Sequence, residues 1–138
     1  EAAALARPHL APGTHLHEGP KALQELIHAC DFDTAIHGVV GCAGLPASVE
    51  ILKRGKRLAL ANKESLVVAG EHLMALAENS GAEIIPVDSE HSAVLQCLRG
   101  EDRARLKRVL LTCSGGPLRL TPQSDLDRVT PEEALKHP

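Results

Sequence analysis

The sequence of 138 residues predicts an α/β protein in which helices cover a parallel sheet. Short apolar, β-branched runs alternate along the chain with segments whose apolar residues recur at helical spacing, which is the pattern of βαβ units. The strand-like runs are also almost continuously apolar. Strands buried on both faces of a parallel sheet have this composition, whereas strands with one solvated face alternate polar and apolar residues.

The first part of the chain predicts a loop, a helix, a strand and a second helix. Residues 1–20 should form a loop, because Pro and Gly interrupt any periodic pattern there. Residues 20–30 carry leucine and isoleucine at helical spacing, behind a Pro that suits a first helical turn. The β-branched run at 34–41 predicts a strand, and residues 46–54 predict a helix that Gly55 closes.

The middle of the chain continues the alternation. Residues 56–61 predict the next strand, and residues 63–79 predict the longest helix, which Gly81 ends. A third strand is expected at 82–87, and a short helix at 91–98. These segments extend the βαβ pattern of the first part.

The last part of the chain predicts a fourth strand at 108–112 and a final short helix. That helix begins with Thr130-Pro131-Glu132-Glu133, where Thr and Glu are spaced as a capping box and Pro takes the first helical position. The chain opens without a first strand and stops soon after this helix starts. We therefore expect it to be part of a larger protein.

The composition excludes several classes of protein. Hydrophobic residues make up 43% of the chain and the net charge is −3, which excludes an intrinsically disordered protein. No apolar run approaches the roughly 20 residues that span a bilayer. A near-neutral charge gives no basis for binding nucleic acid or a membrane surface. The 4 cysteines form no Cys-x-x-Cys pair, which argues against a zinc ribbon and favours buried, reduced thiols in the cytosol.

Three polar clusters follow the expected strands: Asn62-Lys63-Glu64-Ser65, Asp88-Ser89-Glu90-His91 and Ser114-Gly115-Gly116. In a parallel sheet the carboxyl ends of the strands share one edge, at which α/β proteins bind ligands. Asp88 and Glu90 offer the hard oxygen ligands that Mg²⁺ and Mn²⁺ prefer, although Asp88 or Ser89 could instead cap the following helix. Lys63 opens a helix, where a cation opposes the helix dipole. Either an anion or a carboxylate cluster lies nearby, or the lysine is simply solvated.

Two glycine-rich turns and one histidine leave alternatives open. Ser114-Gly115-Gly116 could offer N–H groups and a hydroxyl to a phosphate, or form a tight turn. Gly41-Cys42-Ala43-Gly44 could face a nucleotide, or pack a strand against a helix. His37 lies inside an apolar strand, which predicts a hydrogen-bonded core histidine rather than a metal ligand.

Four longer runs of sequence carry a resemblance to a known family. They are LANKESLV at 60–67, PVDSEHSA at 86–93, LTCSGGP at 111–117 and TPEEALKHP at 130–138. In this order they resemble 1-deoxy-D-xylulose 5-phosphate reductoisomerases, and the pairing of the first two runs is specific. The resemblance covers most of residues 34–138.

The resemblance implies an enzyme of non-mevalonate isoprenoid biosynthesis that rearranges and reduces 1-deoxy-D-xylulose 5-phosphate to 2-C-methyl-D-erythritol 4-phosphate. It implies NADPH and a divalent cation (Mn²⁺, Mg²⁺ or Co²⁺) as cofactors, with Asp88 and Glu90 as metal ligands. Lys63 and Glu90 would be catalytic, and Asn62 and Glu64 would bind NADPH. The implied substrate-binding residues are Lys63, Ser89, Glu90, Ser114 and His137.

The same resemblance implies two incomplete domains. Residues 1–87 would be the C-terminal part of a Rossmann-like NADPH-binding domain, and residues 88–138 the beginning of an α+β catalytic domain that binds metal and substrate. The family's G-x-T-G-x-I-G loop, its third metal carboxylate and its Trp-bearing loop are not in the sequence. We therefore expect the isolated chain to be inactive.

The complete enzyme is expected to be a homodimer in the bacterial cytoplasm, with the plastid stroma as the alternative. Its partner would be a small sugar phosphate, and neither nucleic acid nor a membrane. Two other hypotheses remain. One is another NADP-linked dehydrogenase whose acidic pair only caps a helix, and the other is a non-catalytic nucleotide-binding or assembly module.

Overall fold

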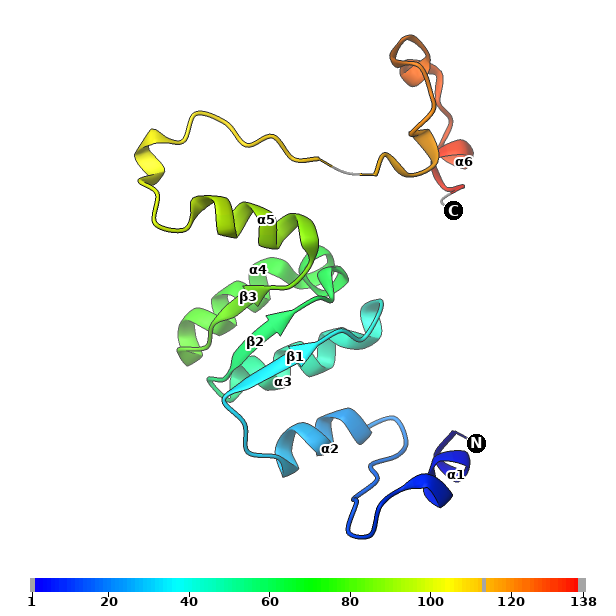
Figure 1. Ribbon diagram of the computed structural model, residues 1–138, viewed down its shortest axis with the longest axis vertical. Helices are drawn as coiled ribbons and strands as arrows, with labels where there is room; N and C mark the ends of the chain where they lie inside the picture. Colours follow the sequence, from blue (N-terminus) through cyan, green and yellow to red (C-terminus); the bar gives the residue numbers. More distant parts are fainter. Residues whose placement is uncertain (1, 113, 137–138) are drawn as a thin grey trace. The chain divides into compact units, whose positions relative to one another are not determined.

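The computed structural model describes residues 2–112 and 114–136 and contains a parallel sheet of three strands (Figure 1). The strands are β1 (Thr34–His37), β2 (Arg57–Leu60) and β3 (Ile84–Pro86), in the order β1-β2-β3. Both pairings are parallel, with His37 beside Leu60 and Leu60 beside Pro86. The predicted α/β class is confirmed.

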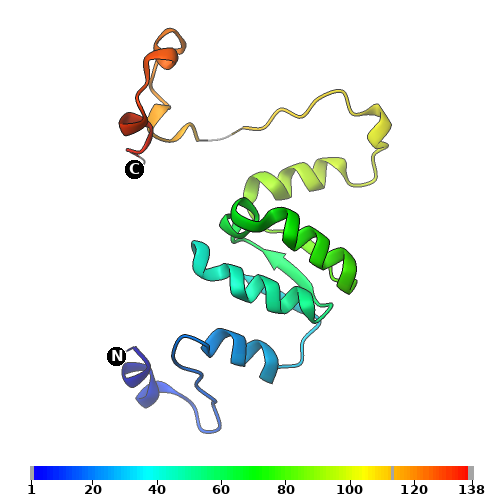
Figure 2. The same ribbon diagram turned by 180° about the vertical axis from the view of Figure 1, so that it is seen from behind.

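Helices connect the strands as the sequence predicts. α2 (Ala22–Ala29) precedes β1, α3 (Leu45–Lys53) joins β1 to β2, and α4 (Lys63–Ser80) joins β2 to β3. α5 (Ser89–Leu98) follows β3 and starts two residues before the predicted helix. Seen from behind, α3 and α4 lie side by side across one face of the sheet (Figure 2).

The core lies between that face of the sheet and the two helices. Its buried hydrophobic side chains are all aliphatic, as the low aromatic content requires: Ile27, Ala47, Ile51, Leu52, Leu58, Leu60, Leu73 and Ala77. Burial alternates along β1, where His37 faces the helices and Ile36, 83% exposed, points to the other face of the sheet. The expectation of strands buried on both faces is therefore wrong for β1, because α3 and α4 pack on the same side.

The N-terminal segment is more ordered than predicted. Residues 1–20 were expected to form only a loop, but they contain the helix α1 (Ala2–Ala6) and a 3₁₀ turn at Arg7–His9. The sequence AAALA consists of residues with high intrinsic helix propensity, and Pro8 suits a first turn, which explains the difference.

The chain divides into two compact units, Glu1–Ser92 and Ala93–Pro138. In the second unit the structure has 3₁₀ turns at Arg103–Arg105, Gly116–Leu118 and Gln123–Arg128, and the short helix α6 (Pro131–Ala134). α6 has the predicted capping box, in which Thr130 Oγ1 accepts from the Glu133 N–H at 3.3 Å and Glu133 Oε2 accepts from the Thr130 N–H at 2.9 Å.

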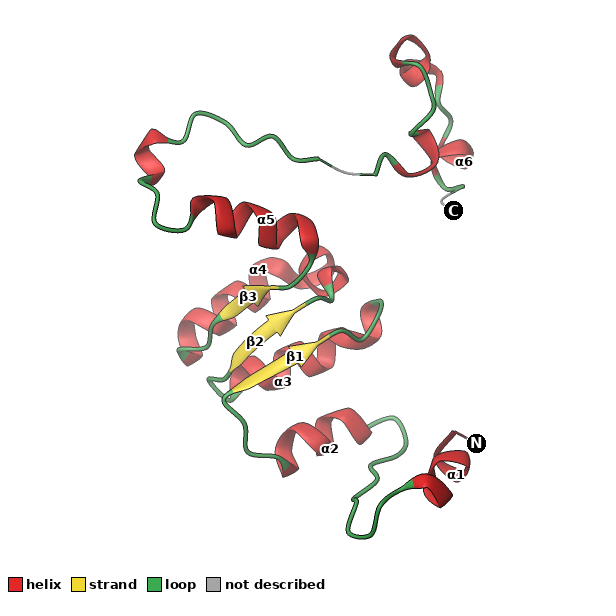
Figure 3. Ribbon diagram, viewed as in Figure 1, coloured by secondary structure: helices red, strands yellow, loops and turns green. Residues whose placement is uncertain are grey.

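The strand predicted at 108–112 is wrong. Those residues are exposed and carry no strand pairing, and Figure 3 shows the stretch as loop. An apolar run becomes a strand only where another strand accepts its hydrogen bonds, and none of the described residues pairs with it.

Two further expectations concern the surface. Cys30, Cys42 and Cys97 are free and exposed, so the prediction of buried thiols is wrong for these three. Within the described residues, no helix combines the length and apolar character that crossing a membrane demands.

Candidate active site

The site is built around an ion pair between the carboxyl ends of β2 and β3. Lys63 is the first residue of α4, three residues beyond the end of β2, and Asp88 follows β3 after one residue. Because β2 and β3 are neighbours in the sheet, the two side chains meet, with Lys63 Nζ 2.9 Å from Asp88 Oδ2. The Asp88 side chain is 10% exposed, so most of its surface is withdrawn from water.

The other carboxylate oxygen of Asp88 faces His91. Asp88 Oδ1 lies 3.0 Å from His91 Nδ1 and accepts from the His91 backbone N–H at 3.5 Å. The backbone contact makes Asp88 a cap of α5, which was the structural alternative to metal binding. Both arrangements use the ionised carboxylate, so the capping role and a ligand role are compatible.

Lys63 holds the pKa of Asp88 well below its usual range, at about 2, chiefly through their hydrogen bond. Desolvation opposes this shift, and the His91 N–H adds to it. The same hydrogen bond raises the pKa of Lys63, with smaller contributions from the charges of Glu90 and Glu64. Asp88 is therefore a carboxylate and Lys63 an ammonium throughout the neutral pH range.

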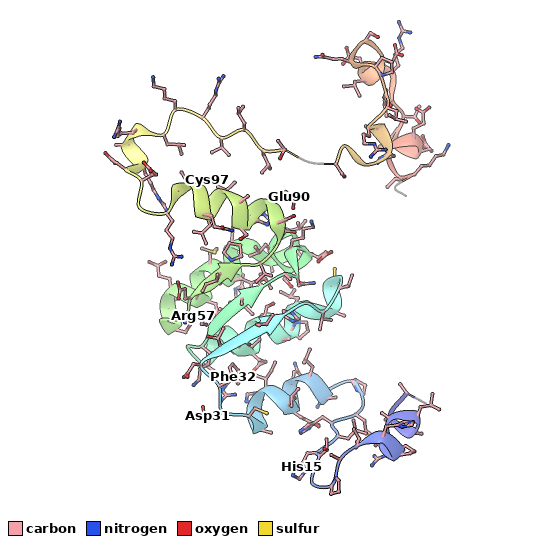
Figure 4. All side chains as sticks on the ribbon, viewed as in Figure 1. His15, Asp31, Phe32, Arg57, Glu90 and Cys97 are labelled. Atoms are coloured by element: carbon pink, nitrogen blue, oxygen red, sulfur yellow. The ribbon has the colours of Figure 1, made fainter. Side chains whose placement is uncertain are left out.

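This cluster accounts for a lysine at a helix N-terminus. The helix dipole disfavours a cation there, but three carboxylates, those of Glu64, Asp88 and Glu90, favour the charged form of Lys63. The structure therefore agrees with the hypothesis of a carboxylate cluster near Lys63, and not with that of a lysine that only water surrounds. Ser89 and Glu90 complete the cluster, since Ser89 Oγ donates to Glu90 Oε2 at 2.7 Å. Glu90 lies in the first turn of α5 (Figure 4).

Asn62 supports the cluster from inside the protein. It is 2% exposed and caps α4, with Oδ1 accepting from the Ser65 N–H at 3.1 Å and from the Ser65 hydroxyl. Its Nδ2 donates to Gly41 O at 2.9 Å, to Glu64 Oε2 at 3.1 Å and to Val39 O. The carboxamide thus ties the start of α4 to the loop that follows β1.

The turn Gly41-Cys42-Ala43-Gly44 lies beside Asn62. Gly41 has φ 72° and ψ −169°, a backbone conformation that residues other than glycine rarely adopt. His37 is 4% exposed and its Nε2 is 2.9 Å from Gly44 O, so the prediction of a hydrogen-bonded core histidine is confirmed.

Sequence reasoning missed the close contact at Gly44. A Cβ on Gly44 would lie 2.8 Å from His37 Nε2 and 2.9 Å from Asn62 Cγ. The sequence signal was a glycine directly before α3, where Ser, Thr, Asp or Asn would cap a helix better.

For two predicted site residues, Ser114 and His137, the structure does not test the predicted role. Ser114 belongs to the second unit, where its Oγ accepts from the Gly116 N–H at 3.3 Å in a turn with positive φ at Gly115 and Gly116. The tight-turn alternative therefore describes its local structure. His137 lies outside the described residues.

The donor chemistry at the end of β3 suits a hard divalent cation. Asp88 and Glu90 are carboxylates, and Ser89 adds a hydroxyl, which are the oxygen donors that Mg²⁺ and Mn²⁺ take. Within the described residues, however, no group of three or more His, Cys, Asp and Glu side chains is arranged to hold a metal ion. Asp88, Ser89 and Glu90 could therefore supply some of the ligands of such an ion, but not a complete set.

Comparison with protein families gives two matches that together cover most of the chain. Residues 2–70 match the family model of 1-deoxy-D-xylulose 5-phosphate reductoisomerase, and residues 84–138 match that of the C-terminal domain of the same enzyme. The reductoisomerase of Xanthomonas oryzae pv. oryzae is 51% identical over 130 residues, which are 94% of this chain and 33% of the relative. That of Thermoanaerobacter pseudethanolicus is 47% identical over 132 residues, 96% of this chain and 34% of the relative.

Solved structures give the same result. The reductoisomerase from Zymomonas mobilis in complex with NADPH is 42% identical, with a TM-score of 0.67 over 87% of this chain and 31% of the other. A DOX-P reductoisomerase in complex with NADPH, fosmidomycin and magnesium is 33% identical, with a TM-score of 0.71 over 99% of this chain and 36% of the other. The chain thus spans about a third of the length of the curated relatives it matches. On the matches of sequence, family model and structure, this chain belongs to the 1-deoxy-D-xylulose 5-phosphate reductoisomerase family.

Proposed function

We propose that this chain contributes to the NADPH-dependent conversion of 1-deoxy-D-xylulose 5-phosphate to 2-C-methyl-D-erythritol 4-phosphate, a step of non-mevalonate isoprenoid biosynthesis. The observation that supports this most directly is the Lys63–Asp88 pair, 2.9 Å apart. It joins the two motifs that carry the family resemblance at one edge of the sheet, where α/β proteins bind ligands.

In this proposal, the charge of each residue in the cluster determines its role. Asp88 and Glu90 would hold the divalent cation, and Glu90 would also face the substrate. Lys63 would bind a substrate oxygen next to the reacting carbons, because its ammonium is kept charged by three carboxylates. Ser89 would hydrogen-bond a substrate oxygen, and Ser114 and His137 would also bind the substrate, Ser114 at its phosphate end. When bound, the cation supplies Lewis acidity to the substrate oxygens and NADPH supplies the hydride.

Glu64 and Asn62 would serve the cofactor in different ways. The Asn62 side chain is buried, and both its Oδ1 and its Nδ2 already have partners within the protein. Glu64 is partly exposed and held by Asn62 Nδ2 at 3.1 Å. We therefore infer that Glu64 contacts NADPH, and that Asn62 acts mainly by fixing Glu64 and the turn at 41–44.

The remaining assignments follow the family. We propose that residues 1–87 belong to the NADPH-binding domain and residues 88–138 to the start of the catalytic domain, and that the complete enzyme is a homodimer. Mg²⁺, Mn²⁺ or Co²⁺ would serve as the cation, since oxygen ligands accept all three. The relatives named above are bacterial, which favours the bacterial cytoplasm over a plastid. The isolated chain has only two of the three metal carboxylates that the family implies, Asp88 and Glu90, so it should not convert the substrate.

A segment replacement tests the proposal. The part of the Xanthomonas oryzae reductoisomerase that aligns with this chain is replaced by the present sequence, and NADPH oxidation is followed with 1-deoxy-D-xylulose 5-phosphate and Mg²⁺. The hybrid should be active, and Lys63→Met should lower its rate about 100-fold or more. Lys56→Met is the matched control, because Lys56 pairs with the 97% exposed Asp31 away from the site and its loss should leave the rate unchanged.

A second variant separates the proposal from the dehydrogenase alternative. Asp88→Asn should abolish metal-dependent turnover if Asp88 is a ligand. If Asp88 only caps α5, this variant should lose stability and keep its rate. An inactive hybrid that still folds and binds NADPH would favour the non-catalytic nucleotide-binding module.

A further inference from the structure

We propose that His37 is a positioning residue for the cofactor side of this site, and that its imidazole fixes the turn at 41–44 against Asn62. The effect on NADPH binding rests on the proposed function, which gives the Asn62–Glu64 pair and the turn beside it to the cofactor. The arrangement itself depends only on His37, Gly44 and Asn62.

The first step is the hydrogen bond of His37. The side chain is 4% exposed, at the end of β1, and Nε2 lies 2.9 Å from Gly44 O. A carbonyl oxygen only accepts, so Nε2 must carry a proton and donate it. The bond spans seven residues of sequence and joins the last residue of β1 to the residue that precedes α3.

The second step is the lack of free space around Gly44. An added Cβ would lie 2.8 Å from His37 Nε2, 2.9 Å from Asn62 Cγ and 3.0 Å from Asn62 Nδ2. The imidazole and the carboxamide therefore both occupy the space that a side chain at residue 44 would need. A change in the position of the imidazole must move either Gly44 or the carboxamide, because densely packed interiors transmit such shifts.

The third step is the return contact from Asn62. Its Nδ2 donates to Gly41 O at 2.9 Å, so Asn62 holds the first residue of the turn while His37 holds the last. The same Nδ2 donates to Glu64 Oε2 at 3.1 Å. His37 is buried and cannot contact a ligand itself, but through Asn62 it helps to fix the position of the Glu64 carboxylate.

Ser48 is the other side chain on Gly44 O, and it does not replace His37. Its hydroxyl donates at 3.5 Å, from within the first turns of α3. That bond lies inside the helix and its cap, whereas the imidazole connects the cap to β1. Without His37 the carbonyl keeps a partner, but the link to the strand is lost.

The test uses the full chain and two variants of His37. His37→Leu keeps the bulk and removes the donor, and His37→Gln restores an N–H near the position of Nε2. Solution NMR should show a proton on His37 Nε2 in the unsubstituted chain. His37→Leu should shift the Asn62 side-chain amide signals and speed the exchange of their protons, and His37→Gln should restore both. Ile27→Ala, a core change on α2, is the control for general destabilisation and should do neither.

The hybrid enzyme described above supplies the functional arm. There His37→Leu should raise KM for NADPH about fivefold, the effect of one hydrogen bond, with kcat nearly unchanged, and His37→Gln should recover most of the loss. Unchanged Asn62 signals in His37→Leu would overturn the positioning role. Shifted signals with an unchanged KM would overturn its link to the cofactor. If the unsubstituted hybrid oxidises no NADPH, the proposed function fails, while the NMR result still decides whether His37 positions Asn62.

Discussion

Asp88 makes two contacts with one carboxylate. It caps α5 through the His91 N–H and pairs with Lys63 across the sheet edge. Both contacts stabilise the ionised form, which is also the form that the proposed metal-ligand role requires. The capping contact therefore does not argue against that proposed role.

Removal of the Lys63 charge should be visible in the titration of Asp88. The pKa of Asp88 is about 2 and Lys63 is the main cause, so Lys63→Met should raise it toward the ordinary value of about 3.9. Because the folded-state pKa is depressed, the pair adds stability above the unfolded-state pKa and loses it as the pH falls toward 2. A ¹³C NMR titration of the Asp88 carboxyl measures this.

Lys56→Met is the control for that titration, and it should leave the pKa of Asp88 unchanged. The stability of the Lys63→Met protein should also vary less with pH between about 4 and 2 than that of the unsubstituted chain. An Asp88 pKa that stays near 2 in Lys63→Met would assign the shift to the α5 N-terminus instead of the lysine.

Two glycines near β1 offer a matched pair of substitutions. Gly44→Ala would place a Cβ 2.8 Å from His37 Nε2, whereas an added Cβ at Gly38 has nothing within 4 Å. Gly44→Ala should therefore lower the free energy of unfolding by about 1–3 kcal/mol, the cost of overpacking. Gly38→Ala should change it by less than about 0.5 kcal/mol. Urea titrations of both variants measure the difference, and equal effects would contradict the close contact at Gly44.

Among the elements, those with local signals were predicted and those that need a distant partner were not. α4 ends where expected, because Gly81 adopts φ 71°, a conformation that glycine favours. The capping box before α6 is also local, with both hydrogen bonds between Thr130 and Glu133. The run at 108–112 has strand composition, but pairing depends on neighbours that composition does not reveal.

The two functions of Asn62 within its element can be separated. Asn62→Ala should destabilise the first unit by about 1–2 kcal/mol through the lost cap of α4. Asn62→Asp keeps an oxygen for the Ser65 N–H at 3.1 Å but removes the donor to Gly41 O at 2.9 Å. In Asn62→Asp, the backbone amides in the first turn of α4 should therefore stay protected from hydrogen exchange, whereas those of the turn at 41–44 should exchange faster.

Amide hydrogen exchange at both places distinguishes these outcomes for Asn62. Thr130→Ala, which removes the side-chain cap of α6 in the other unit, is the control and should leave both places unchanged. Loss of protection in the first turn of α4 in Asn62→Asp would show that the cap and the turn form one cooperative element.

For the molecule as a whole, the sequence predicted that the polar clusters after β2 and β3 lie at one sheet edge, but it did not predict the packing between separate segments. The two motifs around Lys63 and Asp88 are each local, and a parallel sheet places their strand ends on one edge, so their proximity followed from the fold class. The lack of space for a side chain at Gly44, between His37 and Asn62, did not follow, because it depends on the packing of three separate segments. Ser114 lies in the second unit, in which no described residue is buried, so the apolar runs there gave no core from which its surroundings could be predicted.

The contrast between the two units predicts where a protease cuts the chain. Residues 99–112 are all exposed, and the basic ones among them offer trypsin sites: Arg99, Arg103, Arg105, Lys107 and Arg108. Cleavage there should be fast. Lys53 lies in α3, beside the fully buried Leu52, so cleavage at Lys53 requires the first unit to open. Limited trypsin digestion followed by mass spectrometry should therefore yield a persistent fragment that ends within 99–108.

A core substitution tests whether that fragment persists because its unit is folded. Leu52→Ala, at a side chain with 0% exposure, should cost about 2–5 kcal/mol and speed cleavage at Lys53 without changing the rate within 99–112. Leu120→Ala, at an 87% exposed leucine of the second unit, is the control and should alter neither rate. If Leu52→Ala also accelerates cleavage within 99–112, that stretch is protected by the first unit, and the two units unfold together instead of separately.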